Sequence, residues 1–349
     1  MTYLIYGAYG YTGALIVKEA VSKGHKPILA GRNATLTAAI AEKYKLPYEV
    51  FSLEETQKLE DALSKVDLVL HCAGPYSKTA RPMIKACLHT KTHYIDITGE
   101  LEVFEYAASK DQAAVDAGIV LLPGAGFDVV PTDCMAAHLH ELMPDATELE
   151  MGFQSLSKLS RGTALTMTEN LDKGGAIRKD GRILVVPNAY KSRNWEINGK
   201  SISFVSIPWG DVSTAFHSTG IPNIILYFAA HPKMIQKMKK LNRFRWFMGL
   251  GFVQSILQKR VRKNITGPDE KMRESARSMI WGEVTNGKGE KKAALMNTLE
   301  GYKLTSISAV DISAGVLTKG LDPGFYTPSK AFGADYILTI SDTTIEDLS

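Results

Sequence analysis

The sequence is poor in cysteine and has no long apolar run. Its 349 residues include 3 cysteines (Cys72, Cys87 and Cys134), and no two of them form a CxxC pair. So few thiols exclude a disulfide framework and are typical of a chain kept in a reducing compartment. The longest clearly apolar stretch without charge, Trp246–Gln258, is too short to cross a bilayer. We therefore expect a cytoplasmic protein.

Metal-ligand and export signals are also missing. His138 and His140 are two residues apart on an expected helix, where their rings diverge. The first residues, MTYLIYGAYG, contain neither a basic region nor a small-residue cleavage site. A composition of 45% hydrophobic and 22% charged residues excludes a disordered or fibrous chain, and the length favours two domains. We predict no metal site and no export.

Acidic residues are absent from one segment. The formal net charge is +4, but residues 233–263 contain 10 positive side chains and no Asp or Glu, so the rest of the chain is net acidic. A local basic patch indicates binding to an anionic partner and says little about the fold. Its members are Lys233, Lys237, Lys239, Lys240, Arg243, Arg245, Lys259, Arg260, Arg262 and Lys263.

Over the first 130 residues, short apolar runs alternate with helix-like stretches. The expected strands are Tyr3–Tyr6, Pro27–Ala30, Tyr48–Phe51, Asp67–Cys72, Tyr94–Ile97 and Ile119–Leu122. The expected helices are Gly13–Lys23, Thr35–Tyr44, Leu53–Ser64, Thr79–Leu88 and Glu100–Ala117. Strands with interleaved helices predict an α/β domain with a doubly wound parallel sheet. Asn33 is expected to cap the second helix and Gly118 to end the fifth.

After Pro131 the pattern changes to longer strands at irregular spacing. The expected strands are Glu148–Gln154, Arg182–Val186, Ile202–Ile207, Ile224–Phe228, Ser278–Thr285 and Lys291–Thr298, with helices at Thr132–Leu142, Ala164–Leu171, within 233–263 and at Leu304–Leu317. This pattern predicts an α+β domain with a mostly antiparallel sheet. We place the domains at 1–131 and 132–326, with the tail 327–349 packing back on the first domain.

A glycine-rich loop, Gly7-Ala8-Tyr9-Gly10-Tyr11-Thr12-Gly13, follows the first strand and opens the first helix. Glycines at this place permit a tight turn and close approach of the backbone to a pyrophosphate, and the helix N-terminus supplies N–H groups. The spacing is GxxGxxG rather than GxGxxG. We predict dinucleotide binding; the alternative is a glycine turn without a ligand.

The end of the second strand indicates which dinucleotide binds. An NAD enzyme usually has an acid there, but no acid lies between Glu19 and Glu42, and Arg32 occupies the strand end. An arginine can pair with a 2′-phosphate that a carboxylate would repel, which predicts NADP. The alternative is a solvated surface arginine. Ser52, after the third strand, is placed at the adenine.

Polar side chains follow the next three strands, where an open α/β sheet has its ligand crevice. Cys72-Ala73-Gly74-Pro75 is a small-residue loop expected to lie against the nicotinamide and its ribose, and Tyr76 is a candidate proton donor. Asp96, Glu100 and Asp128 follow the fifth and sixth strands and are candidates for acid–base chemistry. Alternatively, Tyr76 is an ordinary loop residue and the acids start a helix or brace the domain junction.

Tyr106 and Lys110 match the YxxxK pattern of short-chain dehydrogenases, in which lysine lowers the pKa of a catalytic tyrosine. That tyrosine usually lies one β/α unit later, with a serine about a dozen residues before it, whereas position 93 here is His93. We therefore interpret the pair as one face of a helix.

Together these motifs resemble those of the saccharopine dehydrogenase-like NADP-binding reductases, especially the branch called trans-acting enoyl reductases. The stretch 180–267 matches that family poorly. The resemblance is carried by Gly7–Gly13 with Ala30-Gly31-Arg32, His71–Tyr76, His93–Glu100, Gly126–Asp133, Arg161–Ala164 and Gly324–Pro328.

The resemblance implies an N-terminal Rossmann domain, a second α+β domain for substrate binding and dimerisation, and hydride transfer from NADPH. In the enoyl reductase branch, the acceptor is an α,β-unsaturated acyl thioester, free or carrier-bound, and Tyr76 and Thr163 are candidate donors to its enolate. A saccharopine or amino-acid dehydrogenase is an alternative, with Arg161, Arg178 and Arg182 as candidates for binding a di-acid. A non-catalytic NADP-binding sensor or scaffold is another.

The basic segment surrounds an apolar stretch that contains Phe244, Trp246 and Phe252. Such a helix between cationic clusters suits an anionic membrane surface or an acidic carrier protein, so the protein is expected in the cytoplasm or at a membrane periphery. The alternative is a core helix with solvated basic ends. No nucleic-acid recognition motif accompanies the charge, so we do not expect nucleic acid as a partner.

Overall fold

The computed structural model describes residues 2–155, 157–169, 172–197 and 199–348, and the chain forms two compact units. The first unit combines Met1–Val130 with Gly301–Phe332. The second unit combines Pro131–Glu300 with Gly333–Ser349. Each unit therefore contains residues from two separate parts of the chain.

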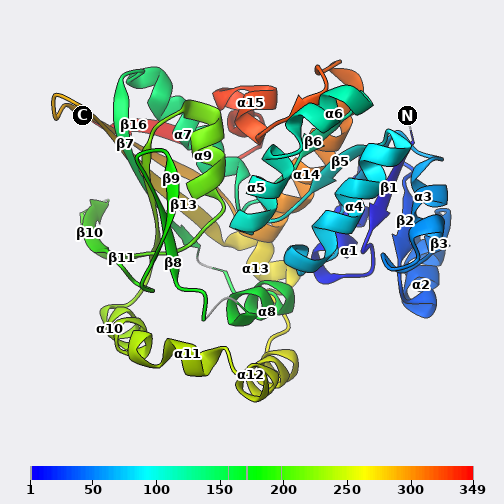
Figure 1. Cartoon of the computed structure of the whole chain (residues 1–349), viewed down its shortest axis with the longest axis horizontal. Helices are drawn as coiled ribbons and strands as arrows, with labels where there is room; N and C mark the ends of the chain where they lie inside the picture. Colours follow the sequence, from blue (N-terminus) through cyan, green and yellow to red (C-terminus); the bar gives the residue numbers. More distant parts are fainter. Residues whose placement is uncertain (1, 156, 170–171, 198, 349) are drawn as a thin grey trace. The chain divides into compact units, whose positions relative to one another are not determined.

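The described part of the first unit contains a seven-stranded sheet in which every pairing is parallel. Its order, β15-β6-β5-β4-β1-β2-β3, reverses direction between β1 and β4, which is where such sheets bind ligands. The predicted doubly wound parallel sheet is thus confirmed (Figure 1). Its strands are β1 (Tyr3–Tyr6), β2 (Ile28–Gly31), β3 (Tyr48–Val50), β4 (Leu68–His71), β5 (His93–Asp96), β6 (Val120–Leu122) and β15 (Gly324–Phe325).

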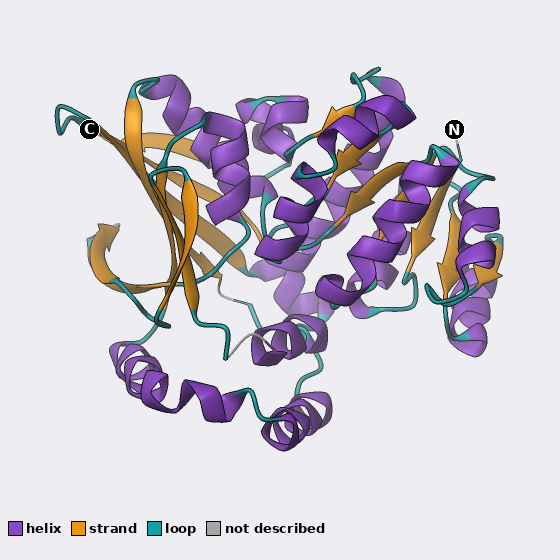
Figure 2. Ribbon diagram, in the orientation of Figure 1, coloured by secondary structure: helices purple, strands orange, loops and turns teal. Residues whose placement is uncertain are grey.

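Helices cover both faces of this sheet (Figure 2). On one face α3, α4, α5 and α6 are neighbours, and α1 packs against α14. Apolar strand residues such as Leu4, Ile5 and Val69 are fully buried, as a sheet covered on both faces requires. The helices are α1 (Tyr11–Ser22), α2 (Ala34–Tyr44), α3 (Thr56–Leu63), α4 (Tyr76–Thr90), α5 (Leu101–Ala108), α6 (Asp111–Ala117), α14 (Gly301–Thr318) and α15 (Pro328–Phe332).

Local signals determine where several of these helices begin and end. The Asn33 side chain accepts a 3.0 Å hydrogen bond from the backbone N–H of Leu36 at the start of α2, and Gly118 ends α6 with a φ of 74°, both as predicted. The single helix expected over 100–117 is instead α5 and α6. At the break, the Ser109 hydroxyl donates 2.7 Å to the carbonyl of Tyr106, so a side chain occupies a helix-end acceptor.

The second unit contains a mixed sheet of nine strands among the described residues. Its main path is β10-β11-β12-β7-β13-β14-β16, and β8 joins β9 to β12. Only β7 and β12 pair in parallel within the described registers, so the predicted mostly antiparallel sheet is confirmed. The strands are β7 (Ala146–Ser155), β8 (Gly175–Lys179), β9 (Arg182–Val186), β10 (Ser192–Ile197), β11 (Lys200–Ser206), β12 (Asn223–Ala229), β13 (Arg277–Asn286), β14 (Lys291–Leu299) and β16 (Thr344–Leu348).

An aromatic cluster packs on one face of this sheet. The rings of Trp195 and Trp281 stack at 3.9 Å between centroids, and Phe204 and Tyr227 pack around Trp195. Met135 and Leu139 of α7 lie over Gly282 of the sheet. The helices of the second unit are α7 (Val130–Leu142), α8 (Arg161–Glu169), α9 (Asp211–Thr219), α10 (Pro232–Leu241), α11 (Arg245–Met248), α12 (Gly251–Asn264) and α13 (Glu270–Ser275), with 3-10 turns η1 (Asn242–Phe244) and η2 (Ala334–Thr339).

The unit boundaries differ from the predicted domains 1–131 and 132–326 with the tail 327–349 returned to the first. Gly301–Phe332 belongs to the first unit because α14 packs on α1 and β15 pairs with β6. Gly333–Ser349 belongs to the second unit because β16 adds to β14. The predicted helix Ala164–Leu171 runs to Glu169, and 170–171 lie outside the described residues.

We expect Gly152→Ala in β7 to lower the free energy of unfolding by about 1–3 kcal/mol, the usual range for overpacking a core. A Cβ at this position would lie 2.5 Å from the Trp195 ring and 2.9 Å from Phe204, so the stacked rings would have to move. Chemical denaturation measures the change. Gly287→Ala, where a Cβ meets nothing within 4 Å, is the control and should leave stability nearly unchanged; equal effects of both substitutions would contradict the packing argument.

Candidate active site

The loops after β1 and β4 meet at the point where the strand order reverses. Gly7 has a φ of +84°, and its N–H donates 2.8 Å to the carbonyl of Ala30 in β2. A Cβ on Gly7 would lie 2.8 Å from the Cβ of Ala73 and 2.9 Å from its backbone nitrogen. Only glycine fits both the backbone angle and the space, so the two loops form one continuous small-residue edge.

The amino end of α1 opens directly from this loop. Gly10 is the N-cap and has no side chain, and a Cβ on Gly13 would overlap the carbonyl oxygen of Gly7. The first turn, Tyr11-Thr12-Gly13-Ala14, contains no acid. The positive end of the helix dipole and its backbone N–H groups thus lie at a loop that a diphosphate can approach closely. This is the geometry predicted for Gly7–Gly13.

Arg32 follows β2 at the same edge, and its side chain is exposed. The Tyr9 ring packs against the preceding residue, since a Cβ on Gly31 would lie 2.5 Å from that ring. Burial raises the pKa of Tyr6 to about 12, and the charge of Arg32 acts in the opposite direction. The guanidinium therefore lies within electrostatic reach of the loop, at the position where an NAD enzyme has its acid.

Ser52, placed at the adenine by the sequence, is half-buried in the loop after β3. Its N–H donates 2.9 Å to Glu55, and its hydroxyl accepts a 3.3 Å hydrogen bond from the N–H of Glu54. These contacts organise the loop itself. A contact of Ser52 with adenine stays a prediction.

The loop Cys72–Pro75 leads from β4 into α4. Burial holds the pKa of the Cys72 thiol far above its usual range, so this thiol is neutral. Tyr76 lies almost fully buried, and its hydroxyl donates 3.2 Å to the carbonyl of His71. That placement favours packing within the first unit over proton donation, so a catalytic role of Tyr76 stays a prediction.

Glu100 joins the loops after β4 and β5. Its two carboxylate oxygens each accept a 2.8 Å hydrogen bond, one from the N–H of Tyr76 and one from the N–H of Ser77. A carboxylate at the amino end of α4 is stabilised by the helix dipole. One feature of the sequence is consistent with the capping of α4 by Glu100. The N-cap residue, Pro75, has no side-chain hydrogen-bond acceptor, so the acceptor for the first N–H groups of α4 comes from another residue.

Asp96 is fully buried at the end of β5 and holds the next loop. It accepts hydrogen bonds from the Tyr94 hydroxyl at 2.5 Å and from the N–H groups of Thr98 and Gly124, each at 2.9 Å. Burial raises its pKa to about 6 against the opposing effect of these hydrogen bonds. Its contacts are those of a brace between β5 and β6, and a catalytic role of Asp96 stays a prediction.

Asp128 differs from Asp96 because its side chain is only half-buried. It packs on the backbone of Gly99, where a Cβ would lie 2.9 Å from its Oδ2 atom. Burial, together with the charge of Glu100, raises its pKa to about 7. A carboxyl group that titrates near neutral pH at the carboxyl edge of the sheet is suited to proton transfer.

The remaining predicted residues lie in the second unit. Thr163 is near the start of α8, where its N–H donates 3.2 Å to the hydroxyl of Ser160. The buried Arg178 donates to the carbonyls of Val212 at 2.8 Å and Gly181 at 2.7 Å, and Arg161 donates 3.2 Å to a carbonyl of the loop after α12. A role of Thr163 at the substrate stays a prediction.

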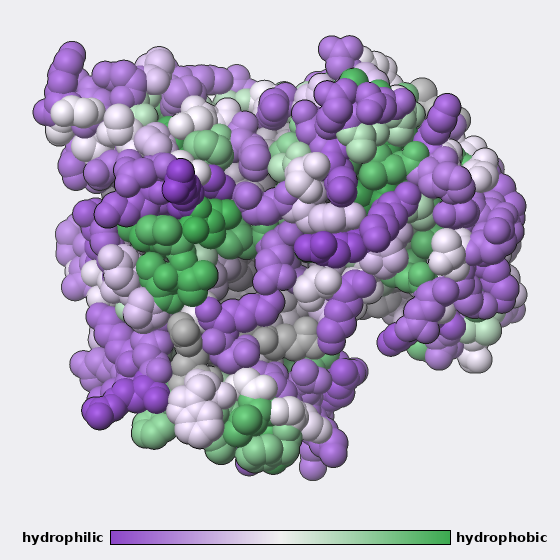
Figure 3. Space-filling model, in the orientation of Figure 1, coloured by the Kyte–Doolittle hydropathy of each residue, from purple (hydrophilic) through white to green (hydrophobic). Residues whose placement is uncertain are grey.

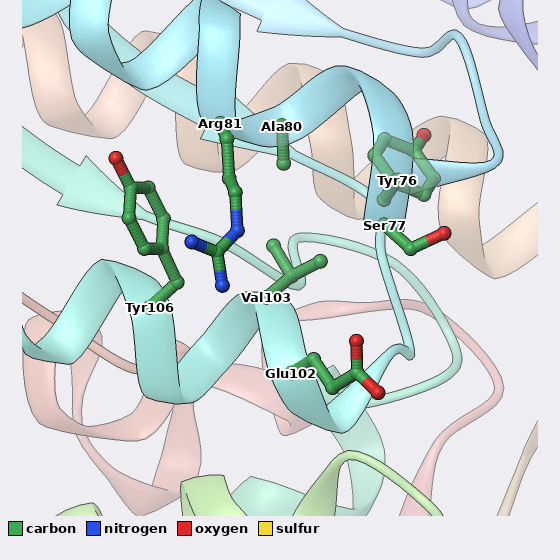
Figure 4. A pocket seen from close by; sticks show the side chains of 7 residues that line it. All are labelled: Tyr76, Ser77, Ala80, Arg81, Glu102, Val103 and Tyr106. Atoms are coloured by element: carbon green, nitrogen blue, oxygen red, sulfur yellow. The ribbon is translucent and has the colours of Figure 1, made fainter. Parts of the chain in front are cut away.

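A small notch lies between α4 and α5 (Figure 4). Its space of about 10 Å³ holds about one water molecule, so it cannot take a substrate. The Arg81 guanidinium lies 4.4 Å over the Tyr106 ring, and Lys110 lies 5.5 Å from the same ring. Lys110 lies in the break between α5 and α6, so the two residues of the YxxxK match do not share one helix face as predicted. Among the described residues, no group of three His, Cys, Asp or Glu side chains could hold a metal ion.

We expect Asp128 to contribute a fall of about 1–3 kcal/mol in the free energy of unfolding as the pH rises from about 4 to about 7. In that window folded Asp128, with its pKa of about 7, holds a proton that the unfolded chain has released, so rising pH favours unfolding. The range is below the full value of the shift because solvent reaches the side chain. Asp128→Asn should remove this contribution, which is measured as the difference between the unfolding free energies of the two proteins at several pH values. The exposed Asp116→Asn is the control, and an unchanged slope in Asp128→Asn would contradict the assignment.

The chain is similar in sequence to two groups of curated proteins. It is 29% identical over 150 residues to the human saccharopine dehydrogenase-like oxidoreductase, a match that covers 37% of this chain and 35% of that protein. It is 28% identical over 145 residues to the trans-acting enoyl reductase of Mycobacterium ulcerans, covering 39% of this chain and 35% of that protein. The matched part thus spans about a third of these relatives' length.

The fold is similar to that of saccharopine dehydrogenase (L-Glu forming) from Saccharomyces cerevisiae in its apo form. The TM-score is 0.70 with 13% identity, and the alignment covers 100% of both chains. The sequence model described as the saccharopine dehydrogenase NADP binding domain matches residues 3–122, the part that carries the glycine loop, Arg32 and the loop after β4. Residues 3–122 therefore match the saccharopine dehydrogenase NADP binding domain, as the motifs of the first unit predicted.

Proposed function

We propose that the protein is an NADPH-dependent reductase of an α,β-unsaturated acyl thioester or a related lipid-like molecule. The observation that carries the proposal is the edge formed by the loops after β1, β2 and β4. There, two glycines leave no room for a Cβ and an exposed arginine stands where an NAD enzyme has an acid. The similarity to a trans-acting enoyl reductase supports the choice of acceptor.

The residues present fit NADP. The amino end of α1 would hold the diphosphate, and Arg32 would pair with the 2′-phosphate. Ala73 and Gly74 are small enough to let the nicotinamide lie against the backbone. When bound, the cofactor supplies the hydride, and the protein supplies position and electrostatics.

Asp128 would act as the general acid of this reaction. Hydride addition to the β carbon of an enoyl thioester leaves an enolate, which must accept a proton at the α carbon. With a pKa of about 7, Asp128 holds a proton in about half of the molecules at neutral pH and can deliver it. Burial, together with the charge of Glu100, which also holds the start of α4, keeps that pKa raised. A group poised in this way favours an enzyme over a non-catalytic sensor.

A saccharopine-type substrate has less support from the side chains. A di-acid would need arginines with free guanidinium groups. Arg178 is buried and bonded to two backbone carbonyls, and its guanidinium also lies 4.1 Å over the Phe216 ring. Of the other two arginines considered for that alternative, Arg161 is exposed and its Nε donates to the carbonyl of Ile265, and Arg182 is exposed on β9.

Arg32→Ala should weaken NADPH binding about 10- to 100-fold, the loss expected for one charge-assisted pair, and leave NADH binding unchanged. Titration calorimetry with both cofactors measures the difference. Lys26→Ala is the matched control because Lys26 is an exposed cation at the opposite end of β2. If Arg32→Ala left the preference for NADPH unchanged, the assignment of the 2′-phosphate would be wrong.

Asp128→Asn should lower kcat with an enoyl thioester by about 100-fold at neutral pH and leave NADPH affinity unchanged, because the cofactor edge is not altered. In the unmodified protein, the rate should fall as the pH rises above about 7, where Asp128 loses its proton. Steady-state kinetics over a pH series test both points, with Asp116→Asn as control. NADPH binding without turnover of enoyl, imine or carbonyl compounds would refute the reductase.

A further inference from the structure

Helices α10, α11 and α12 follow one another along the chain in the second unit. We call residues 232–264 the basic–aromatic segment. The helices follow one another along one edge of the second unit in Figure 1. Among the described side chains of the segment, only Ile235 is buried. The predicted alternative of an ordinary core helix is therefore not what the structure has.

The segment exposes large apolar side chains that a water-facing surface usually hides. Trp246 is 71% exposed, Phe252 60% and Phe244 58%, whereas Trp195 and Trp281 in the core of the same unit are 8% and 6% exposed. In Figure 3, apolar residues gather on the surface over α12. The exposed set is completed by Met234, Leu241, Phe247 and Ile256. A cluster of this kind marks an interaction site.

Positive charge surrounds these side chains. The nine described Lys and Arg residues between 233 and 263 are all exposed, and the segment contains no acid. Within the described part of the chain, none of the nine forms an ion pair. The nearest approach to a partner is the 3.0 Å hydrogen bond from Lys239 to the hydroxyl of Ser192. The charges are thus available to an external anionic surface.

On α12 the apolar and basic residues share a side. Phe252, Ile256, Lys259 and Lys263 follow one another at helical spacings of three or four residues, and all four are exposed. Elsewhere on the helix, Gln254 donates to the carbonyl of Thr168 in α8 at 3.0 Å and to that of Met248 at 2.8 Å. These contacts fix α12 on the unit and keep the Phe252 side outward.

We infer that the basic–aromatic segment docks the protein on an anionic phospholipid membrane. Aromatic and aliphatic side chains on a cationic surface helix enter the interface while Lys and Arg pair with lipid phosphates. In the described residues no helix is long and apolar enough to cross a bilayer, so the segment would lie in the interface. The inference does not depend on the proposed function.

A bilayer explains this surface better than an acidic protein does. The apolar side chains project from separate short helices over a long edge, and a fluid surface accepts many such anchors without a matching shape. A folded protein partner instead concentrates its contacts in a few well-packed pockets. The proposal therefore commits to lipid, and binding to an acidic carrier protein is an outcome of the test that would overturn it.

The full chain should co-sediment with vesicles of phosphatidylcholine and phosphatidylglycerol, and not with vesicles of phosphatidylcholine alone. Lys259→Glu/Arg260→Glu/Lys263→Glu should reduce this binding at least about 100-fold, because each basic residue near an anionic surface contributes several-fold. Lys200→Glu/Lys288→Glu/Lys292→Glu is the matched control, with the same change of net charge at exposed positions of the second unit outside the segment. The control should keep most of the binding.

Fluorescence of Trp246 tests whether the aromatic side chains enter the bilayer. Brominated acyl chains should quench the protein's emission on vesicle binding, and Trp246→Phe should remove most of that quenching while the protein still binds. Thermal melting checks that the exposed substitutions leave the fold intact. Absent vesicle binding, an equal loss in the control triple variant, unquenched Trp246, or binding to an acidic acyl carrier protein but not to vesicles would each overturn the proposal.

Discussion

The close approach of two backbone segments at the centre of the first sheet constrains everything else at the site. Gly7 and Ala73 belong to different loops, yet a Cβ on Gly7 would lie 2.8 Å from the Cβ of Ala73. The absence of a side chain at Gly7 allows the loops at the carboxyl ends of β1 and β4 to approach this closely. It also leaves an edge of backbone and small side chains, which a long, flat cofactor can follow without meeting a large side chain.

The three acids at this edge have different surroundings. The carboxylate oxygens of Asp96 and Glu100 accept hydrogen bonds from backbone N–H groups. These bonds hold the loops after β4, β5 and β6 in place. Asp128 is half-buried, and burial, together with the charge of the neighbouring Glu100, raises its pKa. The residue that holds a helix end therefore also contributes to the raised pKa of the proposed proton donor. Environment, rather than residue type, separates three carboxylates that look equivalent in the sequence.

Features set by local chemistry were predictable from the sequence. The apolar runs of the parallel sheet, the glycine loop and the Asn33 cap all depend on neighbours within a few residues. The pairings of β15 with β6 and of β16 with β14 were not predicted from the sequence. Each of these strands has only two to five residues, and its partner lies in an earlier part of the chain. The cap of α4 by Glu100 depends on a contact across 24 residues. Spacing alone does not encode such contacts.

The charge of the basic–aromatic segment opposes the self-association that its exposed apolar side chains would otherwise favour. Exposed Trp246 and Phe252 would favour association of one copy with another in water, because apolar surface gains by burial against any apolar partner. A segment of like charges repels a second copy of itself, which opposes that association. The same charges attract an anionic surface. The cations around the apolar side chains therefore disfavour association with a second copy of the chain, and the apolar side chains stay exposed. Specific binding depends on such repulsion of other partners as well as on attraction to the right one.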